Sequence, residues 1–140
     1  MSVEDNKAVM RRIYDEVMSQ GNIDLADEFF SDDFVEHEGF PGLPTEGPEA
    51  PKAGFAMLRA AFPDLHMTAD EMIAERDKVV TRGTVSGTHQ GEFMGIPPTN
   101  KSFEVQFMDI IKFHDGKATE HWGLTDQGAM MEQLGIAPPM

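Results

Sequence analysis

The sequence contains no cysteine among its 140 residues. This absence excludes disulfide bonds, thiolate zinc sites, iron–sulfur clusters and a cysteine nucleophile, and it fits a reducing compartment. No apolar run approaches the length of a membrane span. The acidic amino terminus also lacks the apolar segment of a signal peptide. We therefore expect a cytoplasmic protein with no membrane partner.

Basic residues are also scarce. Eleven Lys and Arg stand against 25 Asp and Glu, which gives a formal net charge of −14 at pH 7. A protein this acidic is repelled by phosphate backbones and anionic lipid, so we expect no nucleic-acid partner. Hydrophobic residues nevertheless make up 40% of the chain, which is too many for a disordered acidic protein. The charge by itself indicates a solvated surface rather than a particular partner.

The motifs of several enzyme classes are missing as well. There is no P-loop, no Gly-x-Gly-x-x-Gly, no Gly-x-Ser-x-Gly elbow, and no His-x-His, His-Glu-x-x-His or EF-hand spacing. We therefore expect no cofactor and no metal site. The chemistry that is left belongs to carboxylates, imidazoles and hydroxyls, the groups that acid–base catalysis uses.

The first half of the chain is expected to be helical, because apolar residues recur there at helical spacing between capping and stop residues. A Pro- and Gly-rich loop over residues 39–51 interrupts it and suits a lid or the mouth of a pocket. The expected elements are a helix from Ser2 to Gly21, a short helix from Asn22 that Ser31 to Asp33 ends, a strand at 34–38, and a helix from Pro51 to Pro63.

After Pro63 the apolar period changes to two, which predicts strands joined by tight turns. Helices followed by an antiparallel meander are typical of an α+β fold. Since no linker or repeat divides the chain, we expect one domain over residues 1–140. The expected elements of this part are strands at 65–75, 78–89, 102–114 and 117–126 and a short helix at 128–134.

The strand at 102–114 carries the most informative residue. Its alternate side chains share one face, and five of the six are large and apolar. The sixth is a carboxylate, which is costly to ionise there unless it is paired. We predict that this Asp is a catalytic base; a purely structural hydrogen bond is the alternative. The six are Phe103, Val105, Phe107, Asp109, Ile111 and Phe113.

The following strand supplies a partner for Asp109. If the turn pairs His114 near Gly116, His121 falls opposite Asp109 on the same face. An Asp–His pair in an apolar cavity holds a base near neutral pH and fixes its tautomer. A slip of one residue would instead send His121 outward and place Trp122 in the cavity.

Further side chains are candidates for substrate binding. His37 and His89 fall where strands meet loops, near the expected mouth of a cavity. Tyr14, on the apolar face of the first helix, can offer a hydroxyl to a pocket, although core filling would also explain it. Asp126 ends the last strand, and capping the final helix is its simpler role. Phe107 completes the candidate set, together with Trp122.

Six short segments stand in a characteristic order along nearly the whole chain: Phe62-Pro63-Asp64-Leu65, Thr84 to Phe93, Gly95-Ile96-Pro97-Pro98-Thr99, Asp115-Gly116-Lys117, Glu120-His121-Trp122 and Gln133-Leu134-Gly135. Together they resemble the SnoaL-like polyketide cyclase (ester cyclase) family. The resemblance implies the nuclear-transport-factor-like fold, a cone-shaped curved antiparallel sheet packed on N-terminal helices around a deep apolar pocket, usually as a homodimer through the sheet. It also implies ring closure by intramolecular aldol condensation on a polyketide ester, without a cofactor.

The resemblance singles out two positions. Asp109 stands where the cyclases carry a histidine, and Gly123 stands where they carry a catalytic acid, two residues past His121. We expect a cofactor-independent acid–base enzyme that acts on a small or medium apolar carbonyl compound, by aldol closure or by an isomerase- or dehydratase-type proton transfer. A non-catalytic domain that binds a small apolar molecule is the alternative. Met108 and Ile110, on the outer strand face, suit a dimer interface.

Overall fold

The N-terminal helix follows from its cap and its apolar spacing. The computed structural model describes residues 2–136. Helix α1 (Val3–Arg12) starts with a capping box, in which Ser2 and Asp5 exchange two hydrogen bonds of 3.1 Å. It continues as a π-helical turn, η1 (Ile13–Ser19), and the chain reverses at Gly21, whose φ of 78° favours glycine. The predicted helix is therefore confirmed, with a wider final turn.

The next segment differs from the prediction. A short turn, η2 (Ile23–Leu25), leads into α2 (Ala26–Phe29), as expected, but strand β1 (Phe30–Glu36) begins four residues earlier than predicted. Ser31 to Asp33, the polar residues expected to end the short helix, lie within this strand instead. They are tolerated because β1 is an edge strand, whose side chains from Ser31 to Asp33 can reach solvent.

The remaining elements lie close to their predicted positions. Helix α3 ends just before Pro63, and the final helix begins after Asp126, whose side chain accepts a hydrogen bond from the Ala129 amide. Their bounds are α3 (Glu49–Ala61), β2 (His66–Glu75), β3 (Lys78–Thr88), β4 (Ser102–His114), β5 (Lys117–Thr125) and α4 (Gln127–Leu134).

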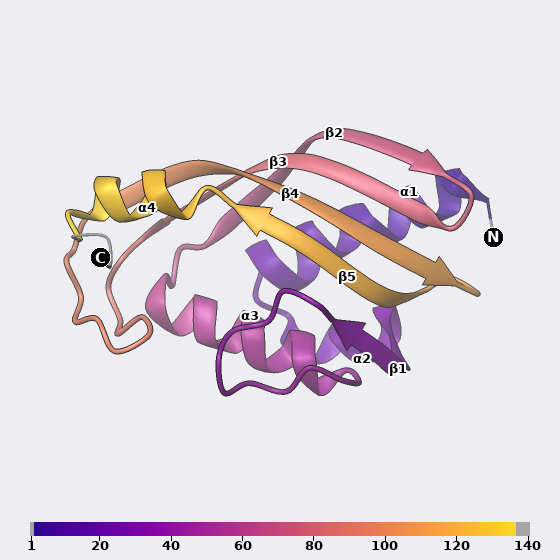
Figure 1. The fold of residues 1–140 in the computed structure, drawn as a ribbon, viewed down its shortest axis with the longest axis horizontal. Helices are drawn as coiled ribbons and strands as arrows, with labels where there is room; N and C mark the ends of the chain where they lie inside the picture. The colour runs from indigo at the N-terminus through magenta and orange to yellow at the C-terminus, as the bar shows by residue number, and fades with distance from the viewer. Residues whose placement is uncertain (1, 137–140) are drawn as a thin grey trace.

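The five strands form one sheet in the order β1-β5-β4-β3-β2. Strands β2 to β5 are the predicted antiparallel meander, and β1 adds to the edge of β5 in parallel. Figure 1 shows α1 and α3 on one side of the curved sheet and α4 at its end. The fold class is thus the predicted α+β architecture, a curved sheet packed on N-terminal helices.

Burial alternates along β4 as predicted: its inner face is buried between sheet and helices, and its outer face is exposed. The core includes Met10, Val17, Phe34, Phe62 and Val79, none of which is more than marginally exposed. In the part of the chain that the structure describes, no helix is long and apolar enough to cross a membrane.

Candidate functional site

Asp109 lies on the inner face of the sheet, between β3 and β5. Its neighbours in register are Thr81 on β3 and Gly123 on β5. The carboxylate is mostly buried and both of its oxygens are engaged: Tyr14 donates its hydroxyl to Oδ2 at 2.8 Å, and His121 Nε2 lies 2.8 Å from Oδ1. Asp109 is therefore paired, as the apolar face of its strand requires.

The opposite side of the His121 ring meets a second carboxylate. His121 Nδ1 lies 2.6 Å and 2.8 Å from the two carboxylate oxygens of Glu36, which sits beside His121 in the β1–β5 register. A ring with a carboxylate at each nitrogen donates from both, so His121 is an imidazolium. Tyr14, Asp109, His121 and Glu36 thus form one hydrogen-bonded chain, which we call the Tyr-Asp-His-Glu network.

The charges in this network determine its protonation. Burial alone would lower the pKa of His121, but the hydrogen bonds and negative charges of Asp109 and Glu36 outweigh it and raise that pKa from 6.5 to about 10. Burial, together with the charge of Asp109, raises the pKa of Tyr14 well above its usual 10. At neutral pH the network therefore contains a cationic imidazole and a neutral phenol.

Apolar side chains surround the network. The Phe107 ring packs against Tyr14 with centroids 5.4 Å apart, and Ile111 and Phe113 continue the same buried face. Such surroundings limit the access of water and strengthen the hydrogen bonds of the charged groups, whose side chains are 14–21% exposed. Phe107 thus lies beside Asp109, as predicted.

A strand irregularity decides which way His121 points. We predicted that His121 pairs with Asp109, but in the structure Asp109 pairs with Gly123 and His121 with Ile111. A bulge at Thr119, whose hydroxyl bonds to the carbonyl of Lys112 at 3.2 Å, inserts one residue into β5. The shift from the predicted register is two residues, which preserves the face, so His121 reaches Asp109 along the diagonal.

Trp122 and His37 lie on the other face of the sheet. Their rings stack with centroids 4.7 Å apart and an interplanar angle of 7°, and His37 also bonds to Glu120 at 3.0 Å. Side chains alternate along a strand, so neither can share a face with its inward neighbours Glu36 and His121. The structure does not bring these two predicted substrate contacts to Asp109.

His89 and Asp126 are also placed elsewhere. His89 is fully buried against Phe62, with Nδ1 3.1 Å from the Thr99 hydroxyl. It lies eight residues along the chain from Thr81, a path of roughly 26 Å at strand rise, so it is not part of the Tyr-Asp-His-Glu network. Asp126 caps α4, the simpler of the roles predicted for it.

Glu36 is the functional candidate that the sequence analysis missed. It is brought to His121 only by the parallel pairing of β1 with β5, across 85 residues of chain. Nothing local in the sequence indicates which strand lies next to β1. The alternation of buried Phe34 with its neighbours was the available signal, because it places Glu36 on the same face as Phe34.

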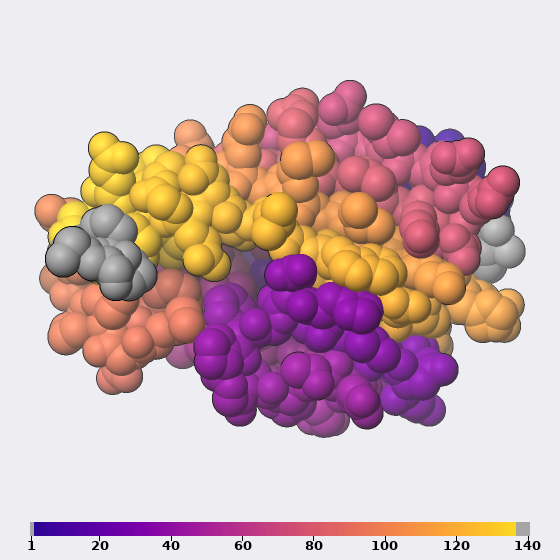
Figure 2. Space-filling view, viewed as in Figure 1, coloured from indigo at the N-terminus to yellow at the C-terminus, as the bar shows by residue number. Residues whose placement is uncertain are grey.

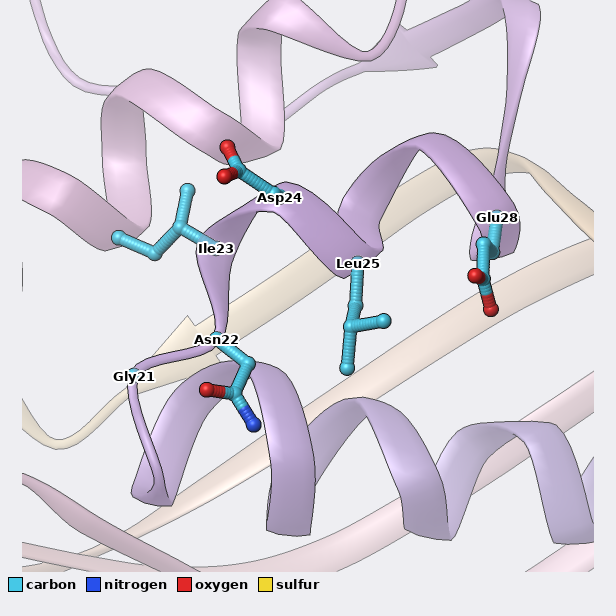
Figure 3. Close-up of a pocket in the computed structure, with 6 residues that line it drawn as sticks. All are labelled: Gly21, Asn22, Ile23, Asp24, Leu25 and Glu28. Atoms are coloured by element: carbon cyan, nitrogen blue, oxygen red, sulfur yellow. The ribbon is translucent and has the colours of Figure 1, made fainter.

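The surface is hollowed at several places. Figure 2 shows a recess between the segment after β1, the β5–α4 region and the β3–β4 loop. A separate hollow of about 630 Å³ lies at the turn after η1 (Figure 3), and another of about 740 Å³ lies where β1, β4 and β5 begin or end. Neither of these two hollows is lined by Asp109 or His121. Within residues 2–136, no group of three or more His, Cys, Asp or Glu side chains is arranged to hold a metal ion.

Comparisons with known proteins agree with one another. The sequence model of the SnoaL-like polyketide cyclase family matches residues 8–134. The nogalonic acid methyl ester cyclase of Streptomyces nogalater is 28% identical over 116 residues, 82% of this chain and 87% of that enzyme. The aklanonic acid methyl ester cyclase AcmA of Streptomyces galilaeus is 26% identical over 129 residues, 91% of this chain and 89% of that enzyme. The solved structure of TsrD from Streptomyces laurentii superposes with a TM-score of 0.88 at 26% identity, over 98% of this chain and 99% of that one.

Proposed function

This chain belongs to the SnoaL-like polyketide cyclase family, and from that premise we propose that it is an acid–base enzyme that needs no cofactor. Its substrate is an apolar, polyketide-like carbonyl compound, and its reaction closes a ring by intramolecular aldol condensation. The observation that carries the proposal is the Asp109 carboxylate, held at both oxygens on an apolar face. A base fixed in this way keeps its geometry while the substrate reacts.

Asp109 takes the proton from the carbon next to a substrate carbonyl. The electron pair of that C–H bond moves into the carbonyl and gives an enolate, whose carbon attacks a second carbonyl of the same molecule. One C–C bond forms, and the proton returns from Asp109 to the new alkoxide. Nothing is oxidised or reduced, so the product is an isomer of the substrate and the step requires only proton transfer.

His121 and Tyr14 have different tasks in this mechanism. The His121 imidazolium orients Asp109 and stabilises it as a carboxylate, while Glu36 fixes the ring from the other side. Tyr14 stays protonated and can turn its hydroxyl from Asp109 toward the developing enolate oxygen. His89, which was also predicted to contact the substrate, bonds to Thr99 instead and does not contact Asp109.

The net charge of the network favours the binding of an uncharged substrate. With Asp109 and Glu36 as carboxylates and His121 as a cation, the network carries one net negative charge. This charge repels a free carboxylate and tolerates an ester or ketone. The relatives are named as methyl ester cyclases, and a neutral ester is the substrate that we propose here.

Asp109→Asn tests the proposal, because it keeps the shape of the side chain and removes the base. Turnover of a panel of β-keto esters should fall by roughly 10²- to 10⁴-fold, the usual contribution of a general base. Asp115→Asn, in the exposed β4–β5 turn, is the matched control and should keep full activity. Turnover undiminished in a folded Asp109→Asn protein would refute the proposal. Tight binding of the esters without turnover by the wild type would favour the non-catalytic binding domain.

We also propose that the outer face of the sheet binds a second copy of the chain. The cross-strand rows there carry exposed apolar side chains, with Leu124 75% and Met108 53% exposed and Ile110 next to them. Helices α1 and α3 occupy the other side of the sheet (Figure 1). An apolar patch of this kind on a highly charged protein is typical of an interface.

A further inference from the structure

The residue that faces Asp109 across β5 has no side chain. A Cβ placed on Gly123 would lie 2.4 Å from Asp109 Oδ1 and 2.8 Å from His121 Nε2. Real Cβ atoms essentially never come so close to other heavy atoms, so any side chain at this position must displace one of the two groups. The Asp109 carboxylate and the His121 imidazole therefore contact each other in the space that a side chain at position 123 would occupy.

Strand geometry explains why that space is needed. Residues directly opposite each other in an antiparallel pair have Cβ atoms roughly 5 Å apart, whereas diagonal neighbours are roughly 7–8 Å apart. Asp109 and His121 are diagonal neighbours, because Asp109 pairs with Gly123 and His121 with Ile111. The short Asp side chain closes this distance by leaning over β5, across the position that a side chain of residue 123 would fill.

Neither group is free to move away. Tyr14 holds the other oxygen of Asp109 at 2.8 Å, and Glu36 holds the other nitrogen of His121 at 2.6 Å. A displacement at Gly123 would therefore stretch or break the Asp109–His121 hydrogen bond and strain the partners behind it. By contrast, the backbone at Gly123 has no positive φ, so its conformation is open to alanine and the obstacle is the contact with the two side chains.

We propose that Gly123 is a positioning residue, whose missing side chain keeps open the space in which Asp109 meets His121 and so determines that the acid of this site comes from β4 rather than β5. The importance of Gly123 for catalysis rests on the proposed acid–base function. The effect of residue 123 on the Asp109–His121 hydrogen bond, however, can be measured without any substrate.

Gly123→Ala tests the inference, with Gly54→Ala as the matched control. A Cβ on Gly54, in α3, would meet no atom within 4 Å, so that substitution should be silent. The first readout is the NMR titration of the His121 ring. Because the contact with Asp109 helps to hold the proton, Gly123→Ala should lower the pKa of His121 by at least about one unit, and Gly54→Ala should not change it. An unchanged His121 titration in folded Gly123→Ala would overturn the inference.

A carboxylate exchange makes the test independent of the folding of that variant. In Asp109→Ala the carboxylate no longer occupies the space above residue 123 and no longer holds the His121 ring on that side, so the ring can yield to a Cβ there. Both Asp109→Ala/Gly123→Ala and Asp109→Ala/Gly123→Asp should therefore fold. Only the second restores a carboxylate beside His121, and it should raise the His121 pKa above that of the first. Equal titrations in the two double variants, or failure of both to fold, would overturn the inference.

Activity then separates the two proposals. If Gly123→Ala lowers both the His121 pKa and kcat, with KM nearly unchanged, the positioning role in catalysis is supported. If the pKa falls and turnover of the ester panel is unaffected, Gly123 positions the pair as inferred, but the proposed function of Asp109 is wrong.

Discussion

The cationic state of His121 should make the stability of the protein depend on pH in a defined direction. Its pKa is raised from 6.5 to about 10 in the folded protein. Between these two values the folded protein holds a proton that the unfolded chain has released, so the free energy of unfolding must fall as pH rises. The stabilisation is fully present below pH 6.5 and is lost as pH approaches 10.

The magnitude follows from the two pKa values. Each pH unit in this window removes about 1.4 kcal/mol, and the whole interval corresponds to about 5 kcal/mol. That is a large fraction of the roughly 5–15 kcal/mol that stabilises a typical domain. Between pH 7 and pH 9, where Tyr14 does not titrate, the free energy of unfolding should fall by about 3 kcal/mol.

Urea unfolding of the wild type and His121→Gln at several pH values between 6 and 9 measures this effect. The variant lacks the titrating group, so the difference in unfolding free energy between the two proteins should shrink steadily as pH rises. His66→Gln, at an exposed position on β2, is the matched control and should keep a constant difference from the wild type. A difference for His121→Gln that does not change between pH 7 and pH 9 would refute the cationic network.

Two further predictions concern the Tyr-Asp-His-Glu network, and a third concerns the apolar patch on the outer face of the sheet. Glu36→Gln removes one of the two carboxylates that hold the ring, so the pKa of His121, followed by NMR, should fall toward 6.5; an unchanged value would mean that Asp109 alone holds the proton. Tyr14→Phe should lower kcat for the ester panel by roughly 10²-fold with little change in KM if the hydroxyl stabilises the enolate, and equal losses in kcat and binding would contradict that role. Met108→Glu places a charge in the exposed apolar patch and should shift the protein from dimer to monomer in sedimentation equilibrium, whereas Glu104→Gln, near one end of β4, should not; a monomeric wild type at micromolar concentration would exclude the dimer.

The sequence predicted the strands of the meander well because their signals are local. Strand β4 has the predicted bounds, Ser102–His114, since its alternation of apolar and polar residues is uninterrupted and a tight turn ends it. The same alternation identified Asp109 as an inward carboxylate among aromatic neighbours. Strand β1 was predicted less well, because its polar residues resemble a helix break and its stability comes from β5, far away in the sequence.

The pairing of Glu36 with His121 could not be predicted from the sequence. The role of Glu36 depends on a parallel pairing that no turn or short motif encodes, so its partner could not be read from the residues around it. His37, next to it, carries the more conspicuous functional group and was predicted instead. One residue along a strand reverses the face, and the structure places the imidazole of His37 outside and the carboxylate of Glu36 inside.

The Tyr-Asp-His-Glu network depends on two irregular positions in β5, the bulge at Thr119 and the glycine at position 123. In an unbroken hairpin from the pair His114–Lys117, Asp109 would face Trp122 and His121 would point outward. The bulge at Thr119 reverses that orientation, and the missing side chain at Gly123 then lets Asp109 lean across to His121. Removing either irregularity separates the acid from the imidazole even though both residues remain on their strands. The chemistry of the site therefore depends on one extra residue and one absent side chain as much as on the groups that exchange protons.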